Sequence, residues 1–337
     1  MRARSFLTTA LIGALAAALA ALSPAPAAAQ GKKMVIAAPG IPPIFASLLL
    51  YVADKEGFFK KHGVEVEVRP FDTGTAAARA VLAGDIEISL SPTVLIIAQI
   101  SNADANIVSF YGFPNPDWIL ASTDATKTNC KDVAGQAVGV DAIGGARSIA
   151  LRTMLLGCPG VKIEEVQQVA LSSNTAPAMI AGRLNFGVLH LDDVAVIEAQ
   201  GKKVHLVLEQ KKTNPTSHYL LVVGRQDKIK ENRDAYVKAT AGMIEAARFM
   251  RDPKNADRVA AADAPIGHSK EISKAALKQF LDMDFWATND DGMDRKKLDA
   301  MTAVAVRTGA ITAGKEPAKY ERVVDPTIWR DANKLVK

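Results

Sequence analysis

The chain has 337 residues, of which 49% are hydrophobic and 23% are charged, and these proportions are those of a globular protein. They exclude a disordered chain, a collagen-like fibre and a polytopic membrane protein, and two cysteines are too few for a disulfide scaffold or a multi-cysteine zinc module. The formal charge of +5 raises the question of a polyanionic partner.

The first element in chain order is a secretory signal, which we predict over residues 1–29. Two arginines precede the apolar run Phe6–Leu22, and Ala27 and Ala29 fit a small-residue cleavage site. The alternative is a membrane anchor, for which the run is short. Without this segment Lys+Arg falls from 41 to 39 against 36 Asp+Glu, so the net charge falls to +3. The remaining bases are scattered along the chain, and we therefore expect no nucleic-acid partner.

Strand and helix patterns alternate through the first third of the remaining chain. Period-two alternation, glycine stops and polar N-caps mark the boundaries. The expected strands are 33–37, 64–68, 84–90 and 106–111, and the expected helices are 44–61, 76–83 and one that begins at 91–93.

The same pattern restarts after Trp118. The expected strands are 136–140, 163–170, 186–189 and 219–223, with helices after 141–148 and 172–175 and only helices from residue 232 onward. Close alternation of strands and helices predicts an α/β fold with two doubly wound, mostly parallel sheets. We expect two lobes, made of residues 30–117 plus 221–337 and of residues 118–220, joined by crossing strands. Sheets of this kind bind ligands in the crevice beyond the carboxyl ends of their strands.

Four segments in this order carry a family resemblance. Residues 51–66 (YVADKEGFFKKHGVEV) and 80–86 (AVLAGDI) are followed by residues 131–140 (KDVAGQAVGV) and 181–187 (AGRLNFG). Together they resemble the signature of the NMT1/THI5-like periplasmic solute-binding proteins, over about residues 33 to 330. In the fourth segment, Asn185 or Gly187 stands where the family usually has an acid or a small residue.

The resemblance implies a two-lobe, clam-shell receptor of the type II-like periplasmic-binding-protein fold, with the ligand in the hinge cleft. Such a protein captures a small molecule in the periplasm and delivers it to the permease and ATPase subunits of an ABC importer, as a monomer and without a cofactor. A ligand-presenting sensor component is an alternative. An enzyme is less expected, because the family's pyrimidine-forming relative uses a cysteine-rich motif that is absent here, and so are the G-x-S-x-G, H-E-x-x-H and Walker motifs.

The strongest local signal is the glycine-rich turn of residues 141–148, which follows a strand and opens a helix. Its glycines, Gly144 and Gly145, let the backbone approach a ligand, and the first N–H groups of a helix favour an anion. Arg147 adds a group that can hold a carboxylate or sulfonate with two hydrogen bonds, and Ser148 adds a hydroxyl. A plain surface turn is the alternative. These residues lead us to expect an organic acid, either a sulfonate or an aromatic or other organic carboxylate.

Other loops that join a strand to a helix supply further candidate ligand-binding residues, although helix capping alone would explain most of the hydroxyls. The polar candidates are Thr73, Thr75, Ser89, Ser91, Thr93, Ser173 and Asn174. The first loop offers Ile41 and Pro42 as a rigid rim and Phe45 as a stacking ring, or else as a core residue. Tyr111 and Trp118, near the predicted first crossover, are candidates for the pocket wall.

His190 and Asp192 follow a strand of the second lobe. A metal site would need further ligands at a suitable spacing, and the other histidines show none, so we expect His190 to contact a polar ligand instead. Cys130 and Cys158 enclose 28 residues, and in an oxidising compartment we expect them to form a disulfide rather than two separate buried thiols.

Overall fold

The computed structural model describes residues 33–172 and 175–336. The predicted signal segment, residues 1–29, lies outside the described residues. Among the helices that are described, none is both long and apolar enough to span a membrane.

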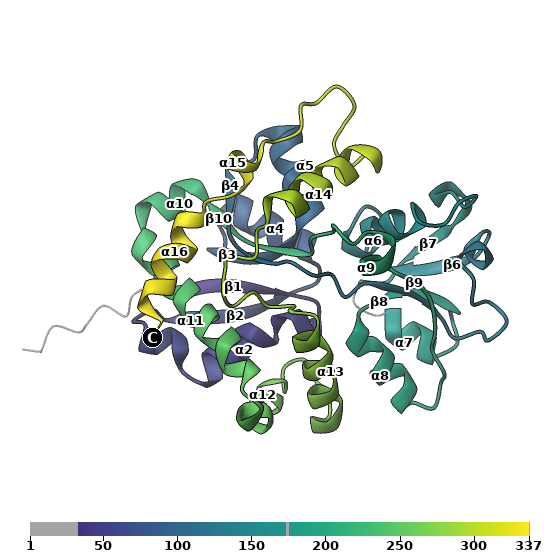
Figure 1. The fold of residues 1–337 in the computed structure, drawn as a ribbon, viewed down its shortest axis with the longest axis horizontal. Helices are drawn as coiled ribbons and strands as arrows, with labels where there is room; N and C mark the ends of the chain where they lie inside the picture. Colours follow the sequence, from purple (N-terminus) through teal and green to yellow (C-terminus); the bar gives the residue numbers. More distant parts are fainter. Residues whose placement is uncertain (1–32, 173–174, 337) are drawn as a thin grey trace, which may run out of the picture. The chain divides into compact units, whose positions relative to one another are not determined.

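Two five-stranded sheets form the framework (Figure 1). The first sheet has the strand order β2-β1-β3-β10-β4 and the second has the order β7-β6-β8-β5-β9. The strands of the first sheet are β1 (Met34–Pro39), β2 (Val66–Phe71), β3 (Ile88–Pro92), β4 (Ile107–Phe113) and β10 (Leu220–Arg225). Those of the second are β5 (Ile119–Ser122), β6 (Ala137–Val140), β7 (Gln167–Ala170), β8 (Phe186–Leu189) and β9 (His205–Glu209).

Each sheet contains one reversed strand. β1 pairs in parallel with β2 and β3, whereas β10 pairs antiparallel with β3 and β4. In the second sheet β6 pairs in parallel with β7 and β8, whereas β5 pairs antiparallel with β8 and β9. The predicted mixed α/β architecture with mostly parallel sheets is therefore confirmed, and the sequence patterns missed β5 and β9. Each reversed strand is the one that the chain enters on crossing from the other sheet.

Helices and short turns cover the sheets. The α-helices are α2 (Leu48–Lys55), α3 (Phe58–Lys61), α4 (Gly74–Ala83), α5 (Thr93–Ala103), α6 (Ala146–Leu155), α7 (Thr175–Ile180), α8 (Leu191–Ala199), α9 (Gln210–Thr213), α10 (Gln226–Glu231), α11 (Arg233–Arg251), α12 (Ala256–Ala262), α13 (Lys270–Asp282), α14 (Arg295–Arg307), α15 (Tyr320–Val323) and α16 (Pro326–Leu335). The 3₁₀ turns are η1 (Phe45–Ser47), η2 (Cys130–Val133), η3 (Ile163–Glu165) and η4 (Pro253–Asn255).

The helix that the sequence predicts over residues 44–61 is three elements, η1, α2 and α3. Gly57 separates the last two with a φ of 75°, a left-handed conformation that glycine adopts at little cost. The strand predicted over residues 163–170 likewise shortens to β7, because its first residues form η3.

The first sheet is buried on both faces. Along β1, Met34, Ile36 and Ala38 pack into one hydrophobic cluster, and Val35 and Ala37 pack into another. This is the period of two that a strand imposes. Figure 1 shows α2, α11 and α12 on one face and α4, α5 and α14 on the other. We call this sheet and its helices (α2–α5 and α10–α16) lobe 1, and the second sheet with α6–α8 lobe 2.

The chain crosses between the lobes twice, through residues 114–118 and 210–219. The two crossovers contact each other, because the Gln210 backbone N–H donates to the Trp118 carbonyl over 3.0 Å. One hydrophobic cluster runs through them without interruption: it includes Phe113, Trp118 and Tyr219 at the crossovers, and it reaches Ile36 in β1 and Val138 in β6.

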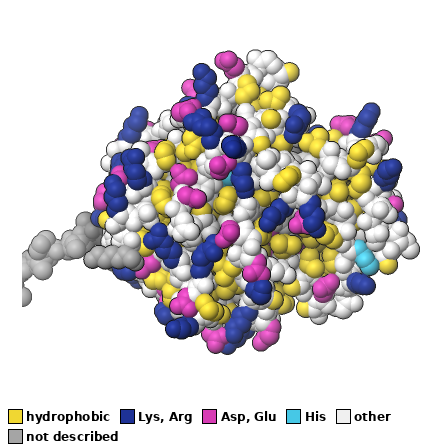
Figure 2. Space-filling model, in the orientation of Figure 1, with side chains coloured by type: hydrophobic (Ala, Val, Ile, Leu, Met, Phe, Trp, Pro, Cys, Tyr) yellow, Lys and Arg dark blue, Asp and Glu magenta, His cyan; other side chains and the backbone are white. Residues whose placement is uncertain are grey.

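A disulfide joins Cys130 and Cys158, with 6.0 Å between the Cα atoms, as the sequence predicts. It ties η2 to the segment that follows α6, within lobe 2. On the face shown in Figure 2, basic and acidic side chains are interspersed rather than gathered by sign. That mixture agrees with the scattered charges of the sequence.

Candidate functional site

A cavity with about 400 Å³ of empty space, its open mouth included, lies where the two lobes meet the crossovers. Gly40, Asp72 and Pro92 line it from the carboxyl ends of parallel strands in lobe 1, and Asp141, Ser172 and His190 do the same from lobe 2. This is the position at which open α/β sheets bind ligands. The remaining lining residues are Pro39, Ile44, Thr73, Gly74, Trp118, Ala146, Arg147, Tyr219 and Leu220.

The turn between β6 and α6 fixes Arg147 at the cavity. The two oxygens of Asp141 accept hydrogen bonds from the backbone N–H groups of Ala146 (2.8 Å) and Arg147 (3.0 Å). A Cβ on Gly145 would lie 2.7 Å from these oxygens, so only glycine fits there. Asp141 therefore occupies the first free N–H groups of α6, and the anion-binding capacity of this turn rests on the Arg147 side chain.

Arg147 is a buried base with part of its guanidinium already engaged. Its side chain is 5% exposed, and Nη1 donates to the Val188 carbonyl (2.6 Å) and approaches the Asp193 carboxylate (3.4 Å). Within the described part of the chain, Nη2 and Nε make no hydrogen bond. The guanidinium carbon lies 5.5 Å from the centre of the Trp118 ring, within cation–π range.

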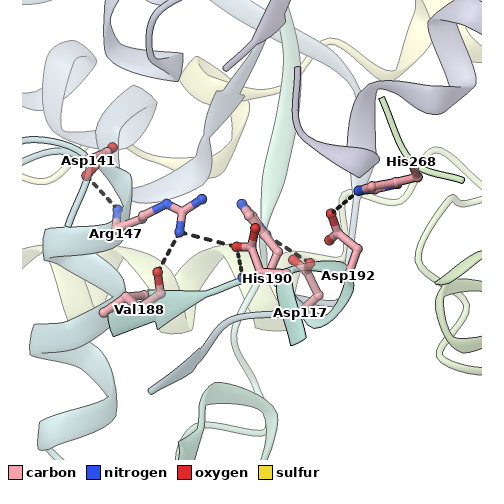
Figure 3. Close-up of polar contacts among 8 residues, drawn as sticks. Asp117, Asp141, Arg147, Val188, His190, Asp192 and His268 are labelled. Carbon is pink, nitrogen blue, oxygen red and sulfur yellow. Dashed lines mark hydrogen bonds and ion pairs between the residues drawn. The ribbon is translucent and has the colours of Figure 1, made fainter. Parts of the chain in front are cut away.

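His190 is also buried at the cavity, with one ring nitrogen bound and the other unpartnered. Nδ1 lies 2.9 Å from Oδ2 of Asp117, a side chain with no exposed surface, and the ring stacks on Trp118 with 3.8 Å between centres. Nε2 has no hydrogen-bond partner among the described residues. In Figure 3 a ring nitrogen of His190 and a guanidinium nitrogen of Arg147 point to the same side, away from Asp117 and Val188.

Asp192 does not line the cavity but lies beside it and connects the lobes. Its Oδ2 is 3.5 Å from Nε2 of His268 (Figure 3), and Nδ1 of His268 is 3.1 Å from Asp263 in lobe 1. Burial, together with the adjacent Asp193 charge, raises the pKa of Asp192 to about 7. Burial alone would lower the pKa of His268, but the bond to Asp263 and the Asp192 charge outweigh it and raise that pKa.

Tyr219, on the second crossover, lines the cavity next to the rings of Trp118 and His190. Its ring meets Trp118 edge to face at 5.5 Å, and its side chain is almost fully buried. Burial raises the pKa of the Tyr219 hydroxyl well above its usual value, and the Asp117 charge adds to this effect. The phenol therefore stays neutral and acts as an apolar wall with a hydrogen-bonding tip.

The lobe 1 side of the cavity is largely uncharged. Thr73 caps α4, since its Oγ1 accepts from the Ala76 N–H at 3.1 Å. The one carboxylate of this side among the described residues, Asp72, accepts a hydrogen bond from Ser172 of lobe 2 over 3.0 Å. That bond spans the two lobes at the edge of the cavity.

The structure places the predicted ligand-binding residues differently: some line the cavity or shape its turn, some are buried elsewhere, and the rest are exposed or lie away from the cavity. Thr73, Trp118, Arg147 and His190 line the cavity, and Gly144, Gly145 and Ser148 shape the turn that holds Arg147. Others are buried away from it. Phe45 packs against Phe280 and Trp286, Tyr111 donates to the Ala287 carbonyl, Ser89 and Ser91 bond each other, and Thr93 bonds His218. Thr75 lies in the first turn of α4 without lining the cavity, Ile41 and Pro42 are exposed, and Ser173 and Asn174 lie outside the described residues.

Sequence reasoning missed Asp117 and Tyr219. Asp117 adjoins Trp118, which that reasoning did mark, and Tyr219 is the first residue of the predicted strand of residues 219–223. A carboxylate directly before the crossover tryptophan was the available signal for Asp117. The described residues contain no group of three or more His, Cys, Asp or Glu side chains arranged to hold a metal ion.

Comparisons with known proteins agree with this architecture. A curated relative from Brucella abortus (strain 2308), described as a binding protein, is 24% identical over 133 residues. That match covers 39% of this chain and 40% of the relative, so the chain matches about two fifths of the relative's length.

Two solved structures share the fold. The ligand-binding component of an ABC-type import system from Staphylococcus aureus, solved with zinc bound, has a TM-score of 0.70 at 12% identity, covering 89% of this chain and 99% of that one. The alkanesulfonate-binding protein SsuA from Xanthomonas axonopodis pv. citri, bound to MOPS, has a TM-score of 0.67 at 13% identity, covering 88% and 97%. The expected two-lobe periplasmic-binding-protein fold is thus confirmed. A family profile described as NMT1/THI5 like matches residues 45–256, and the chain belongs to this family.

Proposed function

We propose that this protein is an extracytoplasmic receptor that captures a small organic anion, either a sulfonate or an aromatic or other organic carboxylate. The observation that carries the proposal is the pairing of Arg147 with His190. Both are buried, both line the cavity and lie against Trp118, and each has a nitrogen without a described partner. In Figure 3 nitrogens of the two side chains point to the same side.

The chemistry of the cavity favours an anion with an organic body. The free edge of the Arg147 guanidinium matches the two oxygens of a carboxylate or sulfonate. Trp118 and Tyr219 offer flat apolar surface to the rest of the ligand. This aromatic wall suits a small organic acid better than a bare inorganic ion such as nitrate.

Capture would proceed by closure of the two lobes about the crossovers. We propose residues 30–117 plus 221–337 as one moving body and residues 118–220 as the other. Contacts such as Asp72 with Ser172 and Asp192 with His268 would form as the lobes close, because each joins one lobe to the other. The ligand would be held without turnover.

Delivery to an ABC permease and its ATPase, from a monomer in the periplasm, completes the proposal. Support comes from the family and from structural neighbours that are binding components of import systems. The predicted signal segment, residues 1–29, agrees with that location.

A thermal-shift screen over carboxylates and sulfonates tests the proposal directly. A ligand at one hundred times its Kd should stabilise the fold by about 2.7 kcal/mol. Arg147→Gln should weaken binding by about tenfold to a hundredfold, because a charge-assisted hydrogen bond contributes about 1.5–3 kcal/mol. Arg152→Gln is the matched control, since Arg152 lies on the same helix outside the cavity. Equal losses in both variants, or no stabilisation by any acid, would refute the proposal.

A further inference from the structure

The His190 ring is held in one orientation with a defined hydrogen position. An ionised carboxylate only accepts hydrogen bonds, so the contact of 2.9 Å with Asp117 places a hydrogen on Nδ1. Stacking against Trp118 at 3.8 Å fixes the plane of the ring. The remaining nitrogen, Nε2, is buried and has no partner among the described residues, and His190 lines the cavity although it is only 3% exposed.

Charged groups approach this ring from every element packed around it. Asp117 comes from the first crossover, Asp192 and Asp193 come from α8, and Arg147 comes from α6. Asp193 is engaged elsewhere, since its Oδ2 accepts from the His190 backbone N–H (2.9 Å) and contacts Arg147 (3.4 Å).

Neither Asp192 nor Tyr219 makes a hydrogen bond to the His190 ring. Asp192 contacts His268, which is in turn bonded to Asp263, and the buried Tyr219 ring lies 6.0 Å from the His190 ring. Of these groups only Asp117 bonds the His190 ring within the described residues.

A hydrogen on Nε2 of His190 would have no acceptor among the described residues. A buried donor without an acceptor costs free energy, and a buried cation needs charge that pairs with it. A bound anion lowers the cost of the unpaired donor and the cost of the buried cation, because its oxygen accepts the hydrogen bond and its charge neutralises the cation. Asp117 stabilises the same cation from the other side of the ring.

We propose that anion binding is coupled to the uptake of one proton by Nε2 of His190, with Asp117 as the residue that positions the ring. The proton comes from solvent or buffer: an N–H bond forms at Nε2 as the bond between that hydrogen and its donor breaks, and no other covalent bond changes. The inference rests on the proposed function and adds to it that the receptor binds an acid together with a proton. By linkage, affinity rises as the pH falls, by up to tenfold per pH unit where one whole proton is taken up.

Calorimetric titration measures the coupling directly. Benzoate and benzenesulfonate are titrated into the mature protein at pH 7.5 in phosphate and in Tris, two buffers that differ in ionisation enthalpy, and the difference in heat gives the number of protons. We expect net uptake approaching one proton and a lower Kd at pH 6 than at pH 8. Net uptake near zero, with a Kd that does not change with pH, would overturn the inference and leave anion binding intact.

Two variants test whether the proton is taken up by His190 or by Asp192. His190→Gln should bind more weakly, with no proton uptake and a flat pH profile, because an amide does not titrate. Asp192→Asn is the control and should retain the uptake. Loss of uptake in Asp192→Asn, or its persistence in His190→Gln, would assign the proton to another group and contradict the inference.

A measurement on the ring itself covers the case in which a variant does not fold. Histidine-selective NMR of the unmodified protein should show the His190 signal move to the imidazolium position when benzoate or benzenesulfonate is added at pH 7.5. If benzoate or benzenesulfonate bound without that shift of the His190 signal, the inference of proton uptake would be contradicted and the proposed anion binding would not. Absence of binding by both compounds at pH 6 and at pH 8 would contradict the proposed function as well.

Discussion

The two lobes face one cavity with different chemistry. Lobe 1 offers proline, glycine and a capped threonine, and its one carboxylate at the described cavity wall, Asp72, is bonded across to Ser172. Lobe 2 presents Arg147 and His190, each locked by carboxylates of its own lobe or of the adjoining crossover. From this contrast we propose that ligand recognition is concentrated in lobe 2, and that lobe 1 supplies the shape of the cavity.

The largest expected effect concerns how lobe 2 keeps its groups in place. The Cys130–Cys158 bond closes a 28-residue loop around β6 and α6. Replacing both cysteines by alanine should lower the free energy of unfolding by about 3–4 kcal/mol, as chain entropy predicts for a loop of this length. Denaturant titration of the variant and of the parent, with and without reductant, gives the value. A loss below about 1 kcal/mol would show that lobe 2 does not depend on this bond.

A second effect tests the buried acid at the lobe junction. The pKa of Asp192, raised to about 7 in the folded state, exceeds that of an unfolded aspartate. The folded protein therefore holds a proton that the unfolded chain releases, so the stability from this group is full at low pH and is lost as the pH rises toward and through about 7. Melting temperatures between pH 4.5 and 8 should fall less steeply for Asp192→Asn than for the parent.

The control for this effect is Asp85→Asn, which replaces an exposed acid in the loop before β3. The melting temperature of that variant should fall with pH as steeply as that of the parent protein. If Asp192→Asn did the same, the raised pKa would not contribute to stability.

The smallest effect is expected on lobe 1. Thr73→Val removes the hydroxyl that caps α4 and retains its shape, at a cost of about 1 kcal/mol in stability. Affinity for the ligand should change by less than about threefold, because we assign this residue no charged contact with the ligand. Titration calorimetry beside Arg147→Gln makes the comparison, and similar losses in the two variants would remove the distinction between the lobes.

Most of the framework was predictable from local patterns, because strands alternate with helices whose starts and stops are marked by glycine and polar caps. The missed strands, β5 and β9, belong to lobe 2 and flank the crossovers. β5 has only four residues, all buried, so it carries no period-two alternation. Its place in the sheet depends on partners far away in the chain.

The site was predictable where a loop alone determines its geometry. The turn of residues 141–148 suggested Arg147, and the loop after β8 suggested His190. Local pattern does not distinguish a strand-end hydroxyl that faces the cavity from one that faces the core, because both faces of these sheets are covered. Ser89, Ser91 and Tyr111 lie inward for that reason. The pairing of Asp117 with His190 joins residues 73 positions apart and required the fold.

The hydrophobic cluster that passes through the crossovers has a thermodynamic consequence. Because Phe113, Trp118 and Tyr219 belong to the same core as Ile36 of lobe 1 and Val138 of lobe 2, neither lobe can melt without exposing part of the other's interior. Heating should therefore produce one cooperative transition. An anion held by the side chains of lobe 2 would then protect amide hydrogens in lobe 1 from exchange, at positions that it never touches.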